Sequence, residues 1–247
     1  MSKRSIAIIQ ARMRSTRLPG KILKTLGDKS CLGHVITRCK AIPGIDNVCC
    51  AIPEEPQSDL IAEETLKFGA LVSRGDEHDV LGRYYKAAQE TNADVIMRIT
   101  SDCPLTDPYV SGKVLRALLE GDYEYACNNM PASYPHGLDS EAFTFDALER
   151  AYRTASTPHE REHVTPWLRN TLGVKKTALP RLGGKLSEMR WTLDFPEDFA
   201  FFEALFKVQP DLGSMYGYNE IIDLLSHHSE IAKINLIHHN VSRPGIA

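Results

Sequence analysis

Short apolar runs alternate with amphipathic stretches through the first half of the chain. The apolar runs are rich in Ile, Val and Ala, which predicts buried strands over residues 5–11, 47–52, 70–73 and 94–100. Between them, apolar residues at helical spacing predict helices over residues 31–42, 58–69, 79–92 and 108–121. Strands that alternate with helices form parallel sheets with crossover helices, so the pattern predicts an α/β fold with one Rossmann-like layered sheet.

This alternation becomes irregular after residue 122. Residues 134–173 predict a loop or short strands followed by two helices, with no clear strand between the helices. Later strands are predicted over residues 174–180 and 189–195, and helices over residues 196–208 and 218–234. Because there is no internal repeat and no clear linker, we expect a single domain over residues 1–247, with an inserted arm over roughly 123–190.

The net charge of the chain limits which classes of binding partner are expected. The chain has 247 residues and a formal net charge of -3, so its surface as a whole has no strong attraction for nucleic acid or an anionic membrane. No run of about 18 apolar residues occurs, so no membrane insertion is expected. Gln10 and Arg12 interrupt the first apolar run too early for a secretion signal. We therefore expect a cytoplasmic protein that does not bind nucleic acid.

Cysteine usage agrees with that location. Six cysteines are present, and none forms a CxxC pair, which favours reduced thiols that act as small buried residues. Cys49 and Cys50 are adjacent, so their side chains point to opposite faces if the segment is a strand. A zinc site or a disulfide framework is the alternative interpretation.

The loop after the first predicted strand concentrates positive charge. Arg12, Arg14, Arg17 and Lys21 occur there with no acidic residue among them. In open parallel sheets, ligands bind at the carboxyl ends of strands, so cations at this place suit a polyphosphate. The glycine fingerprints GxGxxG and GxxxxGK[ST] are both absent, so side chains rather than a glycine nest would hold the phosphates. A solvated basic loop is the alternative.

Longer motifs are more specific than the charge alone. The stretch IIQARMRSTRLPGK resembles the opening motif of the cytidylyltransferases that activate acidic sugars, the acylneuraminate and 3-deoxy-manno-octulosonate enzymes. Further stretches, spread as far as about residue 199, are most similar to the spore coat polysaccharide biosynthesis protein F branch: VLGRYYKAA, MRITSDCPLTDP, YPHGLDSEAFTFDALERA, EREHVTPWL and RWTLDFPEDF. The resemblance implies a glycosyltransferase-A-like fold, CTP as substrate, Mg²⁺, transfer of CMP with release of pyrophosphate, and a homodimer formed through the arm.

The resemblance also assigns residues to the nucleotide. It places Arg12, Arg17 and Lys21 on the triphosphate, with Lys21 as the most critical cation. Gln10, Ala11 and Ser15 complete the nucleotide-binding set from the same loop, although Ser15 is equally suited to cap the turn. Arg98 is left open between contact with the nucleotide and pairing with a buried acid. Arg14 is left outside the set because one residue of such a loop can simply face water.

Two aspartates are expected to bind the metal. Asp102 follows a predicted strand directly, and Mg²⁺ prefers hard oxygen ligands, usually one or two carboxylates plus phosphates. The resemblance places Asp194 as the second ligand, and Asp102 joins Lys21 and Arg12 in the expected catalytic set. From the residues alone, Asp102 could instead cap a turn. Asp107 before a proline is expected to cap the next helix, and Asp198 is expected to be structural in a first helical turn.

The acceptor side is less specific. By the resemblance, His136, Asp139, Glu141, Arg161 and His163 border the acceptor pocket, and one of them or a metal-bound water would act as general base. For each histidine a structural role stays open, and the pairs at 227–228 and 238–239 are expected to be solvated. The YPHGLDSE stretch departs from the octulosonate enzymes, so the expected acceptor is a nonulosonic acid, and a different sugar or polyol stays open as the alternative.

The leading hypothesis is therefore a Mg²⁺-dependent cytidylyltransferase that transfers CMP from CTP to an acidic sugar. A metal-dependent glycosyltransferase on the same fold is an alternative, but its usual Asp-x-Asp motif is absent. A catalytically inactive nucleotide-binding protein is another, and the intact Lys21, Asp102 and Asp194 argue against it. The choice of CTP over other nucleotides rests on the resemblance.

Overall fold

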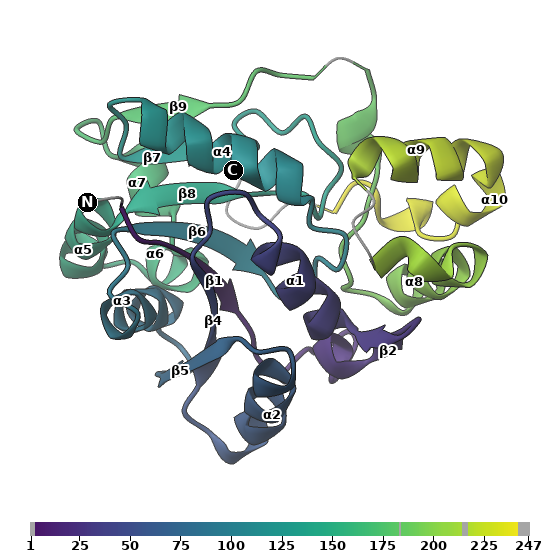
Figure 1. Ribbon diagram of the computed structural model, residues 1–247, viewed down its shortest axis with the longest axis horizontal. Coiled ribbons are helices and arrows are strands. Elements are labelled where there is room, and N and C mark those ends of the chain that lie inside the picture. The colour runs from purple at the N-terminus through teal and green to yellow at the C-terminus, as the bar shows by residue number, and fades with distance from the viewer. Residues whose placement is uncertain (1–2, 183, 214–216, 242–247) are drawn as a thin grey trace.

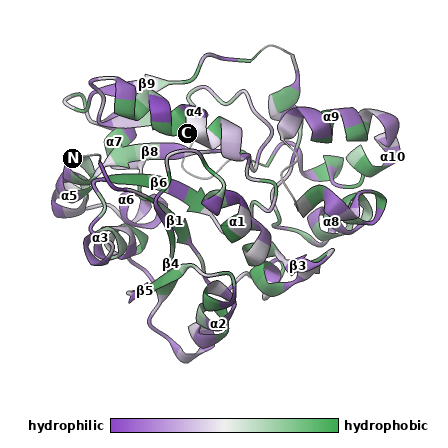
Figure 2. Cartoon of the chain, in the orientation of Figure 1, coloured by the Kyte–Doolittle hydropathy of each residue, from purple (hydrophilic) through white to green (hydrophobic). Residues whose placement is uncertain are grey.

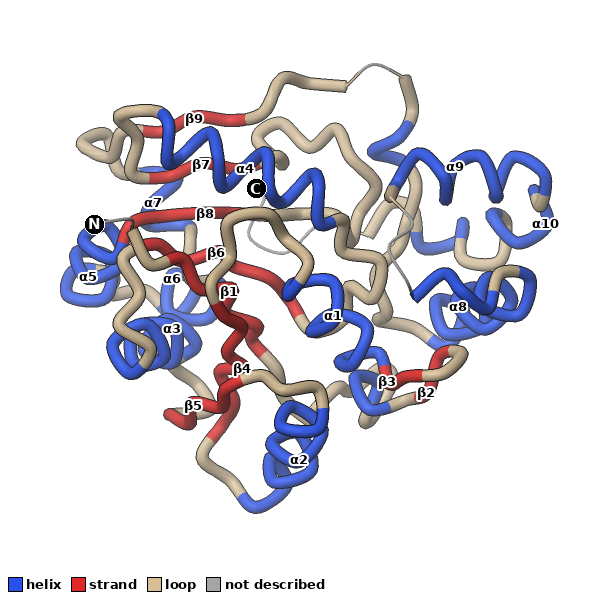
Figure 3. Tube along the Cα trace, in the orientation of Figure 1, coloured by secondary structure: helices blue, strands red, loops and turns tan. Residues whose placement is uncertain are grey.

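A seven-stranded sheet forms the centre of the molecule (Figures 1 and 3). The computed structural model describes residues 3–182, 184–213 and 217–241. The strand order is β5-β4-β1-β6-β8-β7-β9. The strands are β1 Ser5–Gln10, β4 Asn47–Pro53, β5 Leu71–Gly75, β6 Val95–Thr100, β7 Tyr125–Cys127, β8 Glu141–Thr144 and β9 Lys176–Ala178, and a separate hairpin pairs β2 Thr25–Leu26 with β3 Lys29–Ser30.

Helices cover both faces of this sheet. One face packs against α1 Cys31–Lys40, α2 Asp59–Lys67 and α4 Pro108–Glu120, and the other against α3 Val80–Glu90, α5 Phe145–Thr154 and α7 Pro166–Asn170. A third cluster joins α8 Pro196–Val208, α9 Tyr218–His227 and α10 Ser229–Ala232 beside the sheet. The predicted layered α/β fold is confirmed.

Parallel pairing dominates the half of the sheet that the first 100 residues form. β1 runs parallel to β4 and β6, and β4 runs parallel to β5. β1 and β4 are buried on both faces, which explains their continuous apolar runs (Figure 2). Cys49 packs on the α3 side and Cys50 on the α1 side, as predicted, and all six cysteines are buried free thiols.

The segment expected to form an arm is integrated into the same sheet. β8 pairs antiparallel with β6 and β7, and β7 pairs parallel with β9. Residues 123–190 therefore supply one side of the central sheet and are not confined to a projecting arm. The apolar side chains of α5 and α7, including Leu148 and Leu168, pack into the chain's own core.

One predicted strand is wrong. Residues 189–195 form no strand beyond an isolated bridge between His136 and Arg190. The segment crosses the end of the sheet, so its backbone bonds go to loops: Trp191 N donates to His136 O, and Leu193 N donates to Asp102 O. This crossing brings the segment that carries Asp194 beside the loop that carries Asp102.

Helix ends follow local capping rules. Asp107 accepts hydrogen bonds from the backbone N–H groups of Tyr109 and Val110, which confirms it as the cap of α4. The helical region over 157–173 is divided into α6 Pro158–His163 and α7 at Val164, whose φ of 70° no helix allows. Among the described residues, no helix is long and apolar enough to cross a membrane.

Candidate active site

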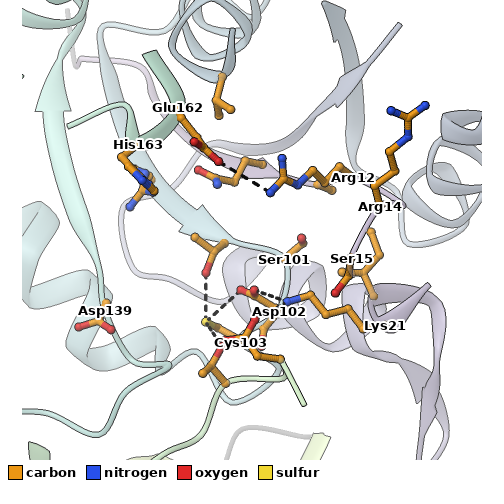
Figure 4. Close-up of a pocket in the computed structure, with 18 of the residues that line it drawn as sticks. Arg12, Arg14, Ser15, Lys21, Ser101, Asp102, Cys103, Asp139, Glu162 and His163 are labelled. Atoms are coloured by element: carbon orange, nitrogen blue, oxygen red, sulfur yellow. Dashed lines mark hydrogen bonds and ion pairs between the residues drawn. The ribbon is translucent and has the colours of Figure 1, made fainter. Parts of the chain in front are cut away.

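A cavity of about 490 Å³ opens at the carboxyl ends of β1 and β6. Its lining comes from the opening loop 10–22, residues 77–83 at the start of α3, residues 98–103 at the end of β6 and just beyond, the segment that carries Asn129, His136 and Asp139, the end of α6, Arg169 of α7, and residues 192–194. Cations from the opening loop and acids from the other segments face one another across it (Figure 4). The sequence placed a ligand site at this edge of the sheet, and the structure has a cavity there.

Lys21 joins the two predicted metal-binding aspartates at the floor of this cavity. Its Nζ atom lies 2.7 Å from Asp102 Oδ2 and 2.8 Å from Asp194 Oδ1. Gly20, with a φ of 65°, turns the backbone immediately before the short 3-10 helix Lys21–Leu23. The turn sends Lys21 inward instead of along the rim, as Figure 4 shows.

The charges of this cluster stabilise one another. Burial by itself lowers the pKa of Lys21, but Asp102 and Asp194 outweigh it and hold that pKa above its ordinary value. Burial works in the opposite direction on Asp102, yet the adjacent ammonium holds the pKa of this carboxyl well below its usual range. The pKa of Asp194 is lowered as well, because Lys21 and Arg190 outweigh burial and the repulsion from Asp102. Both carboxylates are thus ionised at neutral pH.

This arrangement fits a divalent metal ion. Two hard oxygen donors from distant segments converge on one point, which the Lys21 ammonium occupies. In the part of the chain that the structure describes, no group of three or more His, Cys, Asp or Glu could hold a metal on its own. Mg²⁺ commonly takes one or two carboxylates and completes its octahedron with phosphate oxygens and water, so Asp102 and Asp194 suit it.

The remaining cations of the opening loop lie around the mouth of the cavity. Arg12 lies 3.9 Å from Glu162, and Arg17 lies 3.2 Å from Asp194. Arg14 contacts Glu77 at 3.1 Å and Glu55 at 3.6 Å, and its side chain is 61% exposed. Each cation therefore has an acidic partner on another element, which a merely solvated loop would not require.

Gln10, Ala11 and Ser15 also line the cavity. Ser15 accepts a hydrogen bond from Leu18 N at 3.3 Å, so it caps the turn and faces the cavity at the same time. The two roles that the sequence left open for Ser15 are thus compatible in the structure.

Arg98 both lines the cavity and pairs with a buried acid. Its guanidinium lies 2.6 Å from Glu141, whose side chain is only 1% exposed. Glu141 also accepts from Arg169 Nε at 2.9 Å and from the Tyr125 hydroxyl. The expectation that Glu141 borders the acceptor pocket is not met, because this carboxylate is sealed beneath the two arginines and does not line the cavity.

Of the other residues expected at the acceptor pocket, some line the cavity and one does not. His136, Asp139 and His163 line the cavity. Arg161 does not: it forms an ion pair with Asp79 at the start of α3 and lies over the ring of Tyr152. The expectation that Arg161 borders the acceptor pocket is therefore not met, and its ion pair with Asp79 instead joins α6 to the start of α3.

Comparisons with known proteins agree with this geometry. The family described as Cytidylyltransferase matches residues 6–221. The chain belongs to this family. Spore coat polysaccharide biosynthesis protein SpsF of Bacillus subtilis is 30% identical over 237 residues, which cover 91% of this chain and 95% of SpsF.

Solved structures place the fold among related proteins. The structure of a cytidylyltransferase from Leptospira borgpetersenii serovar Hardjo-bovis has a TM-score of 0.87 and 31% identity, covering 94% of this chain and 98% of that one. A CMP:2-keto-3-deoxy-manno-octonic acid synthetase complexed with CTP has a TM-score of 0.64 at 18% identity, covering 83% and 99% of the two chains, which supports the fold alone.

Several residues of this cytidylyltransferase site were not predicted. Glu162 faces Arg12, and Arg169 lines the cavity together with Asn129. Glu162 directly precedes the predicted His163 in the sequence, and this adjacency is the signal that could have indicated Glu162. Arg190 contacts Asp194 and also was not predicted. His238, expected to be solvated, instead stacks on Phe195 and lies 3.0 Å from Glu197.

Proposed function

We propose that this family member transfers CMP from CTP to a hydroxyl of an acidic sugar and releases pyrophosphate. One observation carries the proposal: the Lys21 ammonium contacts both Asp102 and Asp194 at the floor of a cavity whose mouth carries Arg12 and Arg17. Cations for a triphosphate and paired carboxylates for a metal ion are the two components that nucleotidyl transfer requires.

The chemistry asks for little covalent participation from the protein. The acceptor oxygen forms a bond to the α-phosphorus as the bond from that phosphorus to the bridging oxygen of pyrophosphate breaks, and the hydroxyl proton passes to a base. Positioning and charge neutralisation provide most of the rate in such reactions. Arg12, Arg17 and Lys21 would hold and neutralise the triphosphate, with Lys21 nearest the reacting phosphorus.

Mg²⁺ is part of this proposal, with Asp102 and Asp194 as its protein ligands. When bound, it would neutralise charge on the phosphate oxygens that it contacts. Lys21 would then be free to turn from the aspartates toward the phosphates, since its four-carbon side chain carries one mobile charge.

The choice of CTP is supported by the relatives. The family is described as Cytidylyltransferase, and the octonic acid synthetase of the same fold was solved with CTP. The acidic nature of the acceptor is supported by charge. Arg98 and Arg169 line one wall of the cavity, held from behind by Glu141, and two guanidiniums around one carboxylate suit a further anion such as a sugar carboxylate.

His163 is the best candidate for the base. Burial lowers its pKa, against the opposing effect of Glu162, so the imidazole is neutral at neutral pH and able to accept a proton. It lies at the end of α6, where the turn at Val164 directs it and Glu162 toward the cavity. His136 and Asp139 remain on the acceptor wall as orienting groups. A cytoplasmic location and a homodimer complete the proposal.

Pyrophosphate release tests the reaction. CTP, UTP, ATP and GTP are each offered with Mg²⁺ against a panel of acidic sugars, with wild type, Asp102→Ala and, as a matched control, Asp122→Ala. The Asp122 side chain is 92% exposed and pairs with a surface lysine, Lys175. We expect release with CTP and one acidic sugar, lost in Asp102→Ala and kept in the control.

Two other outcomes have distinct meanings. Tight CTP binding without release with any acceptor would retain the nucleotide site and reject the sugars of the panel. Absence of CTP binding would reject the triphosphate site at the opening loop and the proposed function with it.

A further inference from the structure

A buried carboxylate organises the segment that carries Asp194. Asp198, fully buried, accepts hydrogen bonds from the backbone N–H groups of Asp194 and Phe195 at 2.9 and 3.0 Å. It also accepts from Arg190 Nε at 2.9 Å, and Asn235 Nδ2 donates to it at 2.9 Å. Because residues 189–195 belong to no strand, these bonds replace the sheet ladder that would otherwise fix the backbone.

Arg190 binds one of the two carboxylate oxygens of Asp194 and leaves the other to face Lys21. Its Nη2 atom donates to Asp194 Oδ2 at 2.9 Å, while Oδ1 faces Lys21 at 2.8 Å. The carboxylate is thus held from behind by one oxygen, and it presents the other to the floor of the cavity. A carboxylate held in this way loses less conformational freedom when a cation binds to it.

The same guanidinium reaches the acceptor wall. Arg190 Nη1 lies 3.3 Å from His136 Nδ1. A guanidinium can only donate, so Nδ1 is the acceptor in this contact and the imidazole proton resides on Nε2. Arg190 therefore fixes both the tautomer of His136 and the direction of Asp194. Its own side chain is 3% exposed, so it acts from behind both groups.

We propose that Arg190 is a positioning residue that aligns the metal-facing oxygen of Asp194 and the acceptor-facing nitrogen of His136 through one guanidinium held by Asp198. The proposal rests on the proposed function, since it assigns a task within the same site. A purely structural role is the competing interpretation, because a buried ion pair also affects stability when one partner is removed.

Arg190→Lys separates the two interpretations. One ammonium cannot reproduce the planar fork that spans Asp194, Asp198 and His136. The probe is Mn²⁺ binding in the presence of CTP without acceptor, followed by the paramagnetic resonance signal of free Mn²⁺. The dissociation constant is referred to the folded fraction measured by thermal unfolding. Arg150→Lys is the matched control, since Arg150 is exposed on α5 and pairs with Glu124.

We expect Mn²⁺ binding to weaken about 10-fold to 100-fold in Arg190→Lys, as for other residues that orient metal ligands, and to be unchanged in Arg150→Lys. The acceptor KM should rise as well, while CTP affinity without divalent metal stays at the wild-type value. A residue with only a structural role would reduce the amount of folded enzyme and leave these constants unchanged, and that result would overturn the proposal.

A second variant covers the case in which Arg190→Lys does not fold. Asn235→Ala removes the bonds to Arg190 O and Asp198 Oδ1 from the opposite side and leaves every charge in place. We expect Mn²⁺ binding to weaken by up to about 10-fold, the lower end of the range for residues that orient metal ligands, and wild-type affinity in this variant would contradict the proposal. If wild type itself binds no Mn²⁺ with CTP, the proposed function fails, which is a different result from unchanged variants.

Discussion

Two clusters of charge border the same cavity and differ in access. At the floor, the side chains of Lys21, Asp102 and Asp194 are 13%, 25% and 14% exposed. On the wall, Glu141 and Arg169 are 1% and 6% exposed. Both clusters are ion pairs, but only in the first do the carboxylates line the cavity; in the second the two arginines line it and the carboxylate lies behind them. A ligand can therefore exchange partners with the acids of the first cluster, whereas Glu141 serves to hold the two guanidiniums of the wall in place.

This difference explains why neighbouring carboxylates have different tasks. Asp102 and Asp194 face an ammonium that can leave, so their oxygens become available to another cation. Glu141 faces two guanidiniums and a tyrosine hydroxyl that fill its hydrogen-bonding positions. A buried pair contributes through rigidity, and removing one partner leaves an uncompensated buried charge.

The largest expected effect is on the wall cluster. Glu141→Gln keeps the shape of the side chain but leaves Arg98 and Arg169 without the carboxylate that they share. We expect the free energy of unfolding to fall by about 3–5 kcal/mol, measured by urea denaturation. Glu203→Gln, an exposed change on α8, is the control. A variant of normal stability with a raised acceptor KM would instead place Glu141 in direct contact with substrate.

The floor cluster should respond in the opposite way. Lys21→Met removes the cation nearest the proposed reaction, and we expect kcat to fall by about 100-fold to 1,000-fold, equivalent to about 2.7–4 kcal/mol. The melting temperature should fall less than in Glu141→Gln, because Arg17 and Arg190 still face Asp194, and Asp102, which loses its ammonium partner, is 25% exposed and not sealed like Glu141. Lys113→Met, exposed on α4, is the control. Loss of folding together with activity would show that the floor, like the wall, is mainly structural.

Acid should affect the wall through Glu141. Burial raises the pKa of this carboxyl, but Arg169 and Arg98 outweigh burial and lower the pKa to about 2 from 4.5. Since the folded-state pKa is lower than the unfolded one, the unfolded chain binds the proton first as the pH falls. The stabilisation, on the order of 3 kcal/mol, is complete above pH of about 4.5 and is lost as the pH falls toward 2.

Melting temperatures measured between about pH 6 and about pH 2 should show this loss of the free energy of unfolding. Glu141→Gln should have a shallower dependence on pH than wild type over the lower part of the range. Equal slopes in the two proteins would mean that Glu141 carries no such share of the acid sensitivity, and that other carboxylates determine it.

Much of the floor could be predicted from the sequence because its signals are local. The cation-rich loop and Asp102 each follow a strand directly, and parallel strands bring their carboxyl ends to one edge. Most helices and strands up to residue 121 were predicted for the same reason, since their periodicity is uninterrupted. Asp194 was found only through the resemblance, because the segment that carries it is not a strand.

The wall depends on contacts between distant segments, and local pattern does not encode these. Arg161 and Arg169 are both basic residues of one predicted helical stretch, yet only Arg169 lines the cavity. The turn at Val164 ends one helix before the next begins, so helical spacing along the whole stretch does not show which of the two side chains faces the cavity. Glu141 was placed at the acceptor pocket by the resemblance, but the face of the strand on which it lies is decided by pairing with β6 and not by its neighbours in sequence.

The smallest expected effect is at the rim, where access is greatest. Arg14→Gln removes an exposed cation that pairs with Glu77 and Glu55, and exposed pairs contribute only about 0–1 kcal/mol. We therefore expect both the free energy of unfolding and the KM for CTP to change by less than about 1 kcal/mol, which for the KM is roughly 5-fold. Arg17→Gln, a change beside the floor, is the comparison and should raise the KM further. A tenfold or larger increase in Arg14→Gln would mean that Arg14 leaves its acidic partners for the triphosphate, so that the rim behaves like the floor once CTP is bound.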